Sequence, residues 1–378
     1  MEVLHETPVL KFNVDTLQYL RKQYDLDKPE RLEESINHLI DWLKKQDHFL
    51  KKDYSREYLE RTLIISKGSI EKSKVKLDKT CTLRSLVPEF YENFDIQNSP
   101  LLNDISCYFL PKMTKDYYRV VIYNIKGQRF EAGFLDIYRY CIRICEYLQA
   151  NDYSTGIIGV FDFTDTNIMD MLKAVNMFEL LKFSSIIIWL VYMVAHPEGF
   201  EGSCVRVLGR TKFSYGVFSL FSVVGGLSPS CLGEHVKSVP RLNSHWWCRV
   251  FDPLEHGGYG MRLKGLYFIT PSKAIDAIVS IVKQAVSSKV SQRIAVCKDM
   301  EQLNNIIPKI DLPVDYGGKE KSITELSNKL KKELSSKEFN DYFNEMKEAC
   351  TDESYRSKEN FNDQCLGMPG SFRKLTVD

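Results

Sequence analysis

The chain has 378 residues, of which 44% are hydrophobic and 27% charged, and its formal net charge is +1. This length and this balance are typical of one large or two small globular domains with a hydrophobic core. No excess of positive charge indicates nucleic-acid binding, and we expect no nucleic-acid partner.

Helical periodicity dominates residues 12–90. In the segment KPERLEESINHLIDWLKKQ, apolar residues recur on one stripe behind Pro29, which is tolerated in a first helical turn. The segments REYLERTLIISK and SIEKSKVKLDKTCTLR repeat the pattern with short polar joints. We predict an N-terminal helical domain at 12–90 whose apolar faces need a partner surface.

From Tyr117 onward, strand patterns alternate with helical ones. The segments YYRVVIYNIKG and STGIIGVFDFTD read as strands, followed by the helical segments EAGFLDIYRYCIRICEYLQAND and TNIMDMLKAVNMFELLKFSSII. Two further strands, LKGLYFIT and SQRIAVCK, flank the helix SKAIDAIVSIVKQAVSS. This order predicts an α/β fold with a mostly parallel sheet.

The ten cysteines are dispersed and form no CxxC pair, and the first residues lack the basic and apolar segments of a signal peptide. We interpret the cysteines as reduced thiols of a cytoplasmic protein. Cys141 and Cys145 lie one helical turn apart without a nearby histidine or third cysteine. We therefore expect core residues there and no metal or cofactor, with a metal pair as the alternative.

No catalytic motif emerges: the chain has no glycine-rich phosphate loop, no GxSxG and no HExxH. Asp162 lies at the end of a predicted strand and Asp165 just beyond it, and the two could form a carboxylate pair for general acid–base catalysis. Aspartates in a strand-to-helix turn more often act as caps, which is the interpretation we favour. We expect no catalytic residues and a protein that is not an enzyme.

A signature near the end resembles the CRAL-TRIO (Sec14-like) lipid-binding family: a strand, a short helix, then a leucine-proline pair, an acidic residue and Tyr-Gly-Gly. It consists of Leu312, Pro313, Asp315, Tyr316, Gly317 and Gly318. The closing segment GSFRKLTVD is similar to the C-termini of insect members of the family that are related to tocopherol-transfer and retinaldehyde-binding proteins. The resemblance implies a three-layer CRAL-TRIO domain at 100–320 with a gate helix and an apolar cavity, then a C-terminal tail at 321–378.

The resemblance also implies which residues surround the ligand. The wall and the gate would be formed by Phe161, Phe163, Leu266, Phe268, Ile275, Ile278, Val282 and Val286. The last four form a stripe of helical period, which an ordinary amphipathic helix packed on its sheet would also show. Burial of apolar area would hold a ligand in such a cavity without any charge.

Four cations match the positions where tocopherol-transfer and related proteins hold a phosphoinositide headgroup: Arg262, Lys264, Lys289 and Arg293. A polyphosphorylated headgroup needs several cations from different elements that converge on one patch. The alternative is that Arg262 and Lys264 only make a strand edge soluble and bind no headgroup. The resemblance thus implies phosphoinositide-assisted release at a membrane surface.

Residues 188–257 differ from their surroundings. They hold three of the four tryptophans and eight of the twenty glycines, and they show no sustained helical or strand period. We interpret them as an aberrant insertion into the lipid-binding domain, translated from non-coding sequence. A genuine inserted lobe and a membrane-attachment loop are the alternatives.

These observations predict a monomeric, cytoplasmic carrier that associates peripherally with membranes. It would bind and transfer one hydrophobic molecule of the tocopherol, retinoid, carotenoid or phospholipid type. Two other classes compete with this interpretation. One is a membrane-recruited scaffold or signalling module with a vestigial pocket, and the other is a lipid-modifying or hydrolytic enzyme, which the missing nucleophile and base disfavour.

Overall fold

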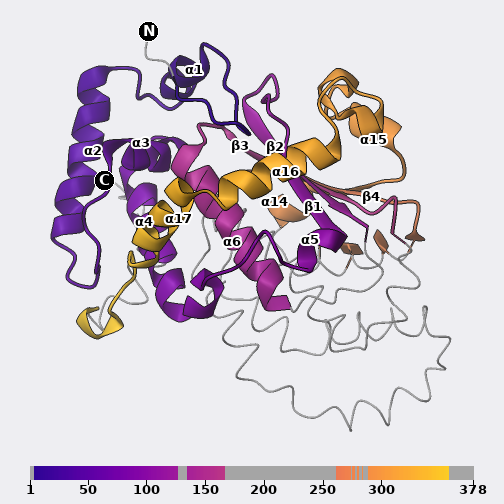
Figure 1. The fold of residues 1–378 in the computed structure, drawn as a ribbon. Helices are drawn as coiled ribbons and strands as arrows, with labels where there is room; N and C mark the ends of the chain where they lie inside the picture. Colours follow the sequence, from indigo (N-terminus) through magenta and orange to yellow (C-terminus); the bar gives the residue numbers. More distant parts are fainter. Residues whose placement is uncertain are drawn as a thin grey trace, which may run out of the picture.

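The structure, a computed structural model, describes residues 4–126, 134–166, 261–273, 275–276, 279–280, 283 and 288–356. The described part begins with helices that pack on one another and continues into a single sheet (Figure 1). No helix in these ranges is long and apolar enough to cross a membrane.

Four helices form the N-terminal region: α1 (Thr16–Gln23), α2 (Pro29–Lys44), α3 (Arg56–Ile65) and α4 (Ile70–Leu86). Ser55 and Ser69 cap α3 and α4 by accepting hydrogen bonds from backbone N–H groups three residues further on, which fixes where these helices begin. The apolar stripe of α2 is buried in the shared core. The short elements η1 (Pro88–Tyr91) and α5 (Leu101–Asp104) lead into the sheet.

The sheet has five strands in the order β1-β2-β3-β4-β5. They are β1 (Ile105–Phe109), β2 (Tyr118–Ile125), β3 (Gly156–Asp162), β4 (Leu263–Ile269) and β5 (Ile294–Cys297). Only β1 is antiparallel to its neighbour; the other pairs are parallel. The helix α6 (Phe134–Asn151) connects β2 to β3. The predicted class is confirmed: a helical N-terminal region precedes a mixed, mostly parallel sheet.

The first face of the sheet packs on elements that follow it in the chain. Ile122 and Val160 are register partners, and both belong to a core that includes Leu303 of α15 (Met300–Asn304) and Leu326 of α16 (Ile323–Leu334). In Figure 1, α16 lies across the sheet, with α15 beyond its far end. Helix α6 contributes no residue to this core. We call this side of the sheet the signature face, because Leu312 of the signature is buried in it.

The predicted C-terminal tail, 321–378, begins with α16 and α17 (Lys337–Lys347). Met346 of α17 and Ala349 are buried in the core of the N-terminal helices. Just beyond them, Thr351 pairs with Phe49 in an isolated antiparallel bridge. The chain therefore returns from the sheet to the helical region. The remaining short elements are α14 (Ser288–Ser291), η2 (Lys309–Asp311), η3 (Val314–Tyr316) and η4 (Glu353–Tyr355).

Candidate functional site

The second face of the sheet carries a row of aromatic side chains. Tyr123 of β2, Phe161 of β3 and Phe268 of β4 are successive register partners. The rings of Tyr123 and Phe161 stack with centroids 4.8 Å apart, and those of Phe161 and Phe268 with centroids 5.4 Å apart. Because side chains alternate along a strand, this row lies opposite the signature face. We call this side the aromatic face.

Helix α6 covers the edge of the aromatic face. Cys107 of β1 pairs with Tyr123 of β2, and Tyr123 in turn lies near enough to Cys141 and Cys145 of α6 for electrostatic interaction. Burial raises the pKa of both α6 thiols well above the ordinary range, which keeps them protonated. No group of three metal-binding side chains is present in the described part of the chain.

Most of the predicted wall residues that the structure describes gather on the aromatic face. Alternation along β3 and β4 places Phe161, Leu266 and Phe268 there, and Phe163 directly follows β3; each of the four is at most 6% exposed. Gly159 pairs with Leu266, and a Cβ at Gly159 would lie 2.8 Å from the Leu266 Cδ1 atom. Glycine at this position therefore leaves room for the leucine side chain over the sheet.

The predicted gate is described only in part. Ile275, shortly after β4, is fully buried. Ile278, Val282 and Val286 lie outside the described residues, as does the predicted insertion at 188–257. The roles of these residues stay predictions.

The four predicted cations lie at the amino ends of two neighbouring parallel strands. Arg262 and Lys264 are at the beginning of β4, Arg293 directly precedes β5, and Lys289 is in α14 just before it. Because β4 and β5 are parallel, their amino ends meet at one edge of the sheet. The four residues therefore lie at the same edge of the sheet, which we call the basic edge.

The two arginines of the basic edge also have structural contacts. The Arg262 guanidinium donates a hydrogen bond to the Tyr24 hydroxyl, and its Cζ lies 5.5 Å from the centroid of that ring. Arg293 Nη1 donates to the Leu263 carbonyl oxygen at 2.5 Å. Burial raises the pKa of Tyr24, against the opposing effect of the Arg262 charge. Nothing in the sequence near Arg262 indicates this contact with the helical region.

The two lysines of the basic edge are more accessible. Lys264 and Lys289 are both exposed. The Lys264 Nζ atom lies 5.1 Å from the centroid of the Tyr118 ring, at the beginning of β2. This geometry holds the ammonium group by cation–π attraction while leaving it accessible to solvent.

The carboxyl end of the central strand is tied to the signature. The fully buried Asp162 carboxylate accepts hydrogen bonds from Asn124 Nδ2 at 2.9 Å and from the Tyr316 hydroxyl. It also accepts one from the Thr164 backbone N–H at 2.9 Å, which is a capping contact. Asp165 is exposed. Asp162 thus anchors the signature and caps the turn.

The glycines of the signature permit a very close turn. Gly317 adopts the left-handed conformation, with φ of 73°. A Cβ at Gly318 would lie 1.8 Å from the Leu312 carbonyl oxygen, so no other residue fits there without moving the backbone. The Asp315 carboxylate then accepts a hydrogen bond from the Ile323 backbone N–H at 2.8 Å, at the beginning of α16. The signature is therefore a structural junction between the sheet and α16.

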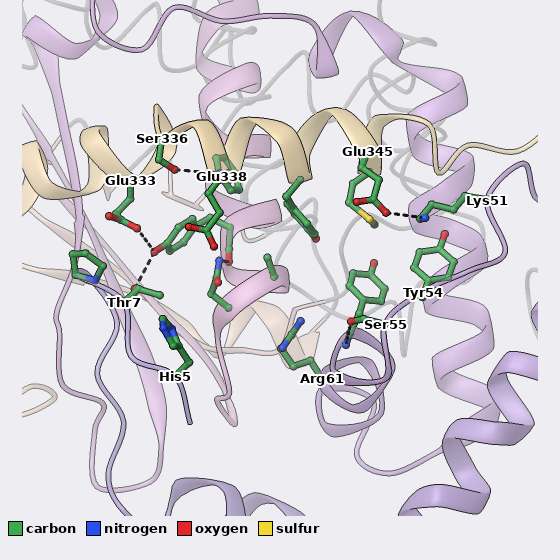
Figure 2. A pocket seen from close by; sticks show the side chains of 18 of the residues that line it. His5, Thr7, Lys51, Tyr54, Ser55, Arg61, Glu333, Ser336, Glu338 and Glu345 are labelled. Atoms are coloured by element: carbon green, nitrogen blue, oxygen red, sulfur yellow. Dashed lines mark hydrogen bonds and ion pairs between the residues drawn. The ribbon is translucent and has the colours of Figure 1, made fainter. Parts of the chain in front are cut away.

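A pocket of about 510 Å³ is lined by residues of neither the aromatic face nor the basic edge (Figure 2). It lies between the first residues, α3, the end of α6 and the α16–α17 joint, and none of the predicted wall residues lines it. Several of its polar groups pair with one another: the Tyr147 hydroxyl lies within 3.1 Å of both Thr7 and Glu333, and Lys51 Nζ is 2.9 Å from Glu345. These charged and hydroxyl groups lie among apolar residues such as Phe339 and Met346, so the lining is mixed, unlike the apolar wall expected around a lipid.

Two domain models match the chain. A Pinta-like UBA domain matches residues 28–101, within the helical region, and a CRAL/TRIO domain matches residues 255–318, from just before β4 through the signature. No curated protein matches the chain. Among solved structures, the crystal structure of Sfh5 is similar at 11% identity and a TM-score of 0.40, covering 84% of this chain and 92% of that one.

Proposed function

We propose, starting from the resemblance to the CRAL-TRIO family that the domain match confirms, that this chain is a non-enzymatic carrier of one hydrophobic molecule. The family is a lipid-binding and transfer family in general terms. The finer proposal concerns where the molecule binds. We place it on the aromatic face, against Phe161 and Phe268.

The observation that carries this proposal is the aromatic row itself. Three rings from three adjacent strands form a continuous apolar surface on the face opposite the signature. Stacked rings of this kind present a large apolar area in a fixed orientation. A ligand with a few hundred Å² of apolar surface gains about 25 cal/mol for each Å² that it buries, so it needs few polar contacts.

A matched pair of substitutions in β4 tests this location. Phe268 lies on the aromatic face, whereas its neighbour Tyr267 packs against the core of the signature face. We expect Phe268→Leu to weaken binding of a fluorescent fatty-acyl probe about tenfold, which corresponds to about 1.4 kcal/mol. Tyr267→Leu should leave probe affinity unchanged. Equal losses in both variants, or none in either, would place the ligand elsewhere.

We further propose that the basic edge binds the phosphates of a phosphoinositide headgroup and that this contact favours release of the cargo. Four cations from two strands and a short helix meet at one edge, which supports this function. For binding to promote release, the lipid headgroup must have a higher affinity for the open state of the carrier than for the closed one.

A further inference from the structure

The pocket drawn in Figure 2 has no part in the proposed carrier function. Five aromatic residues line it: Tyr54, Tyr58, Tyr147, Phe339 and Tyr342. Its lining also holds six residues with a formal charge: Asp53, Glu333, Glu338, Glu345, Lys51 and Arg61. Four of these are carboxylates and two are cations, so the lining carries a formal charge of −2 when His5 is neutral. A cavity with this balance favours a cationic ligand over an anionic one.

Both cations of the pocket already have partners within the protein. Lys51 Nζ lies 2.9 Å from the Glu345 carboxylate and 3.1 Å from the Asp53 carboxylate. Arg61 Nε donates a hydrogen bond to the Gln149 carbonyl oxygen at 2.9 Å. An anionic ligand would have to displace these contacts, whereas a cationic ligand leaves them intact.

The other two carboxylates have no cationic partner. Glu333, near the end of α16, accepts a hydrogen bond from the Tyr147 hydroxyl at 3.1 Å, and Glu338, in the first turn of α17, is exposed. Neither forms an ion pair with another residue of the described part of the chain. Figure 2 shows both side chains extending from the α16–α17 joint toward the part of the pocket where Thr7 lies. Their negative charge is therefore available to a ligand.

Aromatic rings lie beside these carboxylates. The rings of Tyr147 and Phe339 meet edge to face with centroids 5.4 Å apart, and those of Phe339 and Tyr342 stack with centroids 6.1 Å apart. Such rings attract a cation through their faces and also offer apolar area to its carbon skeleton. The Tyr342 hydroxyl is buried without a hydrogen-bond partner, so the lining contains a polar group that the protein alone does not satisfy.

We propose that this part of the pocket binds a small organic cation, a primary ammonium attached to an aromatic group. The ammonium has three donors for the carboxylates of Glu333 and Glu338, and the aromatic group packs against Phe339 and Tyr342. The site shares no residue with the aromatic face or the basic edge. Its failure would therefore leave the carrier function untouched, and the failure of the carrier function would leave this site untouched.

Equilibrium dialysis with two matched probes tests this assignment. The wild-type protein is dialysed at pH 7 and low ionic strength against 2-phenylethylammonium or against 2-phenylethanol, which has the same ring and chain without the charge. We expect the ammonium to bind about tenfold more tightly than the alcohol and to bind more weakly as salt is added. Equal affinity for the two probes, or no measurable binding of the ammonium, would overturn the proposal.

Two substitutions locate the binding site. Glu338→Gln removes the charge of an exposed side chain with little change of shape, and we expect it to weaken binding of the ammonium about fivefold. Glu348→Gln is the matched control, because Glu348 is also exposed and directly follows α17 but does not line the pocket. Its affinity for the ammonium should equal that of wild type. Equal weakening in the two variants would indicate a general charge effect and would contradict the site.

Discussion

The Tyr316 hydroxyl of the C-terminal signature donates a hydrogen bond to the buried Asp162 carboxylate at the end of β3. The two residues are 154 positions apart in the chain. Asn124 of β2 donates to the same carboxylate oxygen at 2.9 Å. Three separate segments therefore meet at one buried charge, which joins the signature to the middle of the sheet.

Removing this hydroxyl should destabilise the fold. Tyr316→Phe keeps the ring but leaves the buried Asp162 oxygen with one donor fewer, and we expect the free energy of unfolding to fall by about 1–3 kcal/mol. Urea denaturation measures this loss. Tyr355→Phe is the matched control. Because Tyr355 is 66% exposed, removal of its hydroxyl should change the free energy of unfolding little. Equal stability of Tyr316→Phe and wild type would show that the contact does not anchor the signature.

Local patterns in the sequence predicted much of the fold. Helices α2, α3 and α6 and strands β2 to β5 lie within segments whose apolar period or β-branched composition indicated them, and α4 runs two residues beyond its segment. Strand β1 was not predicted, since Ile105–Phe109 is a run of only five residues, too short to show a clear period, and it lies at the sheet edge. Local pattern therefore gave the central elements and missed the antiparallel edge.

Contacts between distant segments could not be predicted in the same way. The hydrogen bonds of Tyr316 to Asp162 and of Arg262 to Tyr24 join residues more than 150 positions apart, so no spacing in the chain signals them. The burial of α4 is a second case. Lysines and hydroxyl residues are frequent in its second half, yet residues 76–84 are buried, and His48, Glu146 of α6 and Arg356 supply partners for Asp78 and Arg84.

The stability of the chain should fall in acid because of Asp78. Burial alone would raise the pKa of Asp78, but hydrogen bonds from His48 and Arg356 outweigh this effect and lower it to about 2, from an ordinary 3.8. A carboxyl group whose folded pKa is depressed stabilises the fold above its unfolded pKa, and this stability is lost as pH falls from about 4 to about 2. We expect a loss of about 2 kcal/mol over this range.

Asp78→Asn isolates this contribution. The variant should be less stable than wild type at pH 7. Near pH 2 the free energies of unfolding of the two proteins should converge, because the asparagine does not titrate. Urea unfolding at several pH values measures both curves. Parallel curves for the two proteins would contradict the assignment to Asp78.

The basic edge can be tested with its two exposed lysines. Arg262 and Arg293 also hold Tyr24 and the Leu263 carbonyl, so their removal would disturb the fold as well as the charge. We expect Lys264→Ala/Lys289→Ala to weaken binding to phosphoinositide-containing vesicles about thirtyfold, at about 1 kcal/mol for each lysine. Affinity for an apolar probe in solution should be unchanged.

The double variant Lys28→Ala/Lys332→Ala removes the same charge from exposed sites on α16 and just before α2. It should retain vesicle binding and phosphoinositide-dependent transfer of cargo. Equal weakening in both double variants would indicate a general charge effect. Neutralising all four cations of the basic edge should abolish phosphoinositide-dependent transfer, and unchanged transfer would contradict the proposed headgroup site.

The predicted insertion can be examined in messenger RNA. Residues 163–262 connect the parallel strands β3 and β4, whereas a crossover between parallel neighbours needs only about a dozen residues or more, usually with one helix. We expect transcripts that join the codon of Ile187 directly to that of Gly258. If every transcript across this region contained the codons for 188–257, the segment would belong to the expressed protein.

Mass spectrometry of the purified protein under non-denaturing conditions tests the carrier function most directly. The proposal predicts a population whose mass exceeds that of the polypeptide by one small apolar molecule, which organic extraction removes and identifies. Phe268→Leu should reduce this population, whereas Tyr267→Leu should not. A protein that carries no such molecule, and that takes up none when incubated with lipid vesicles, would contradict the account.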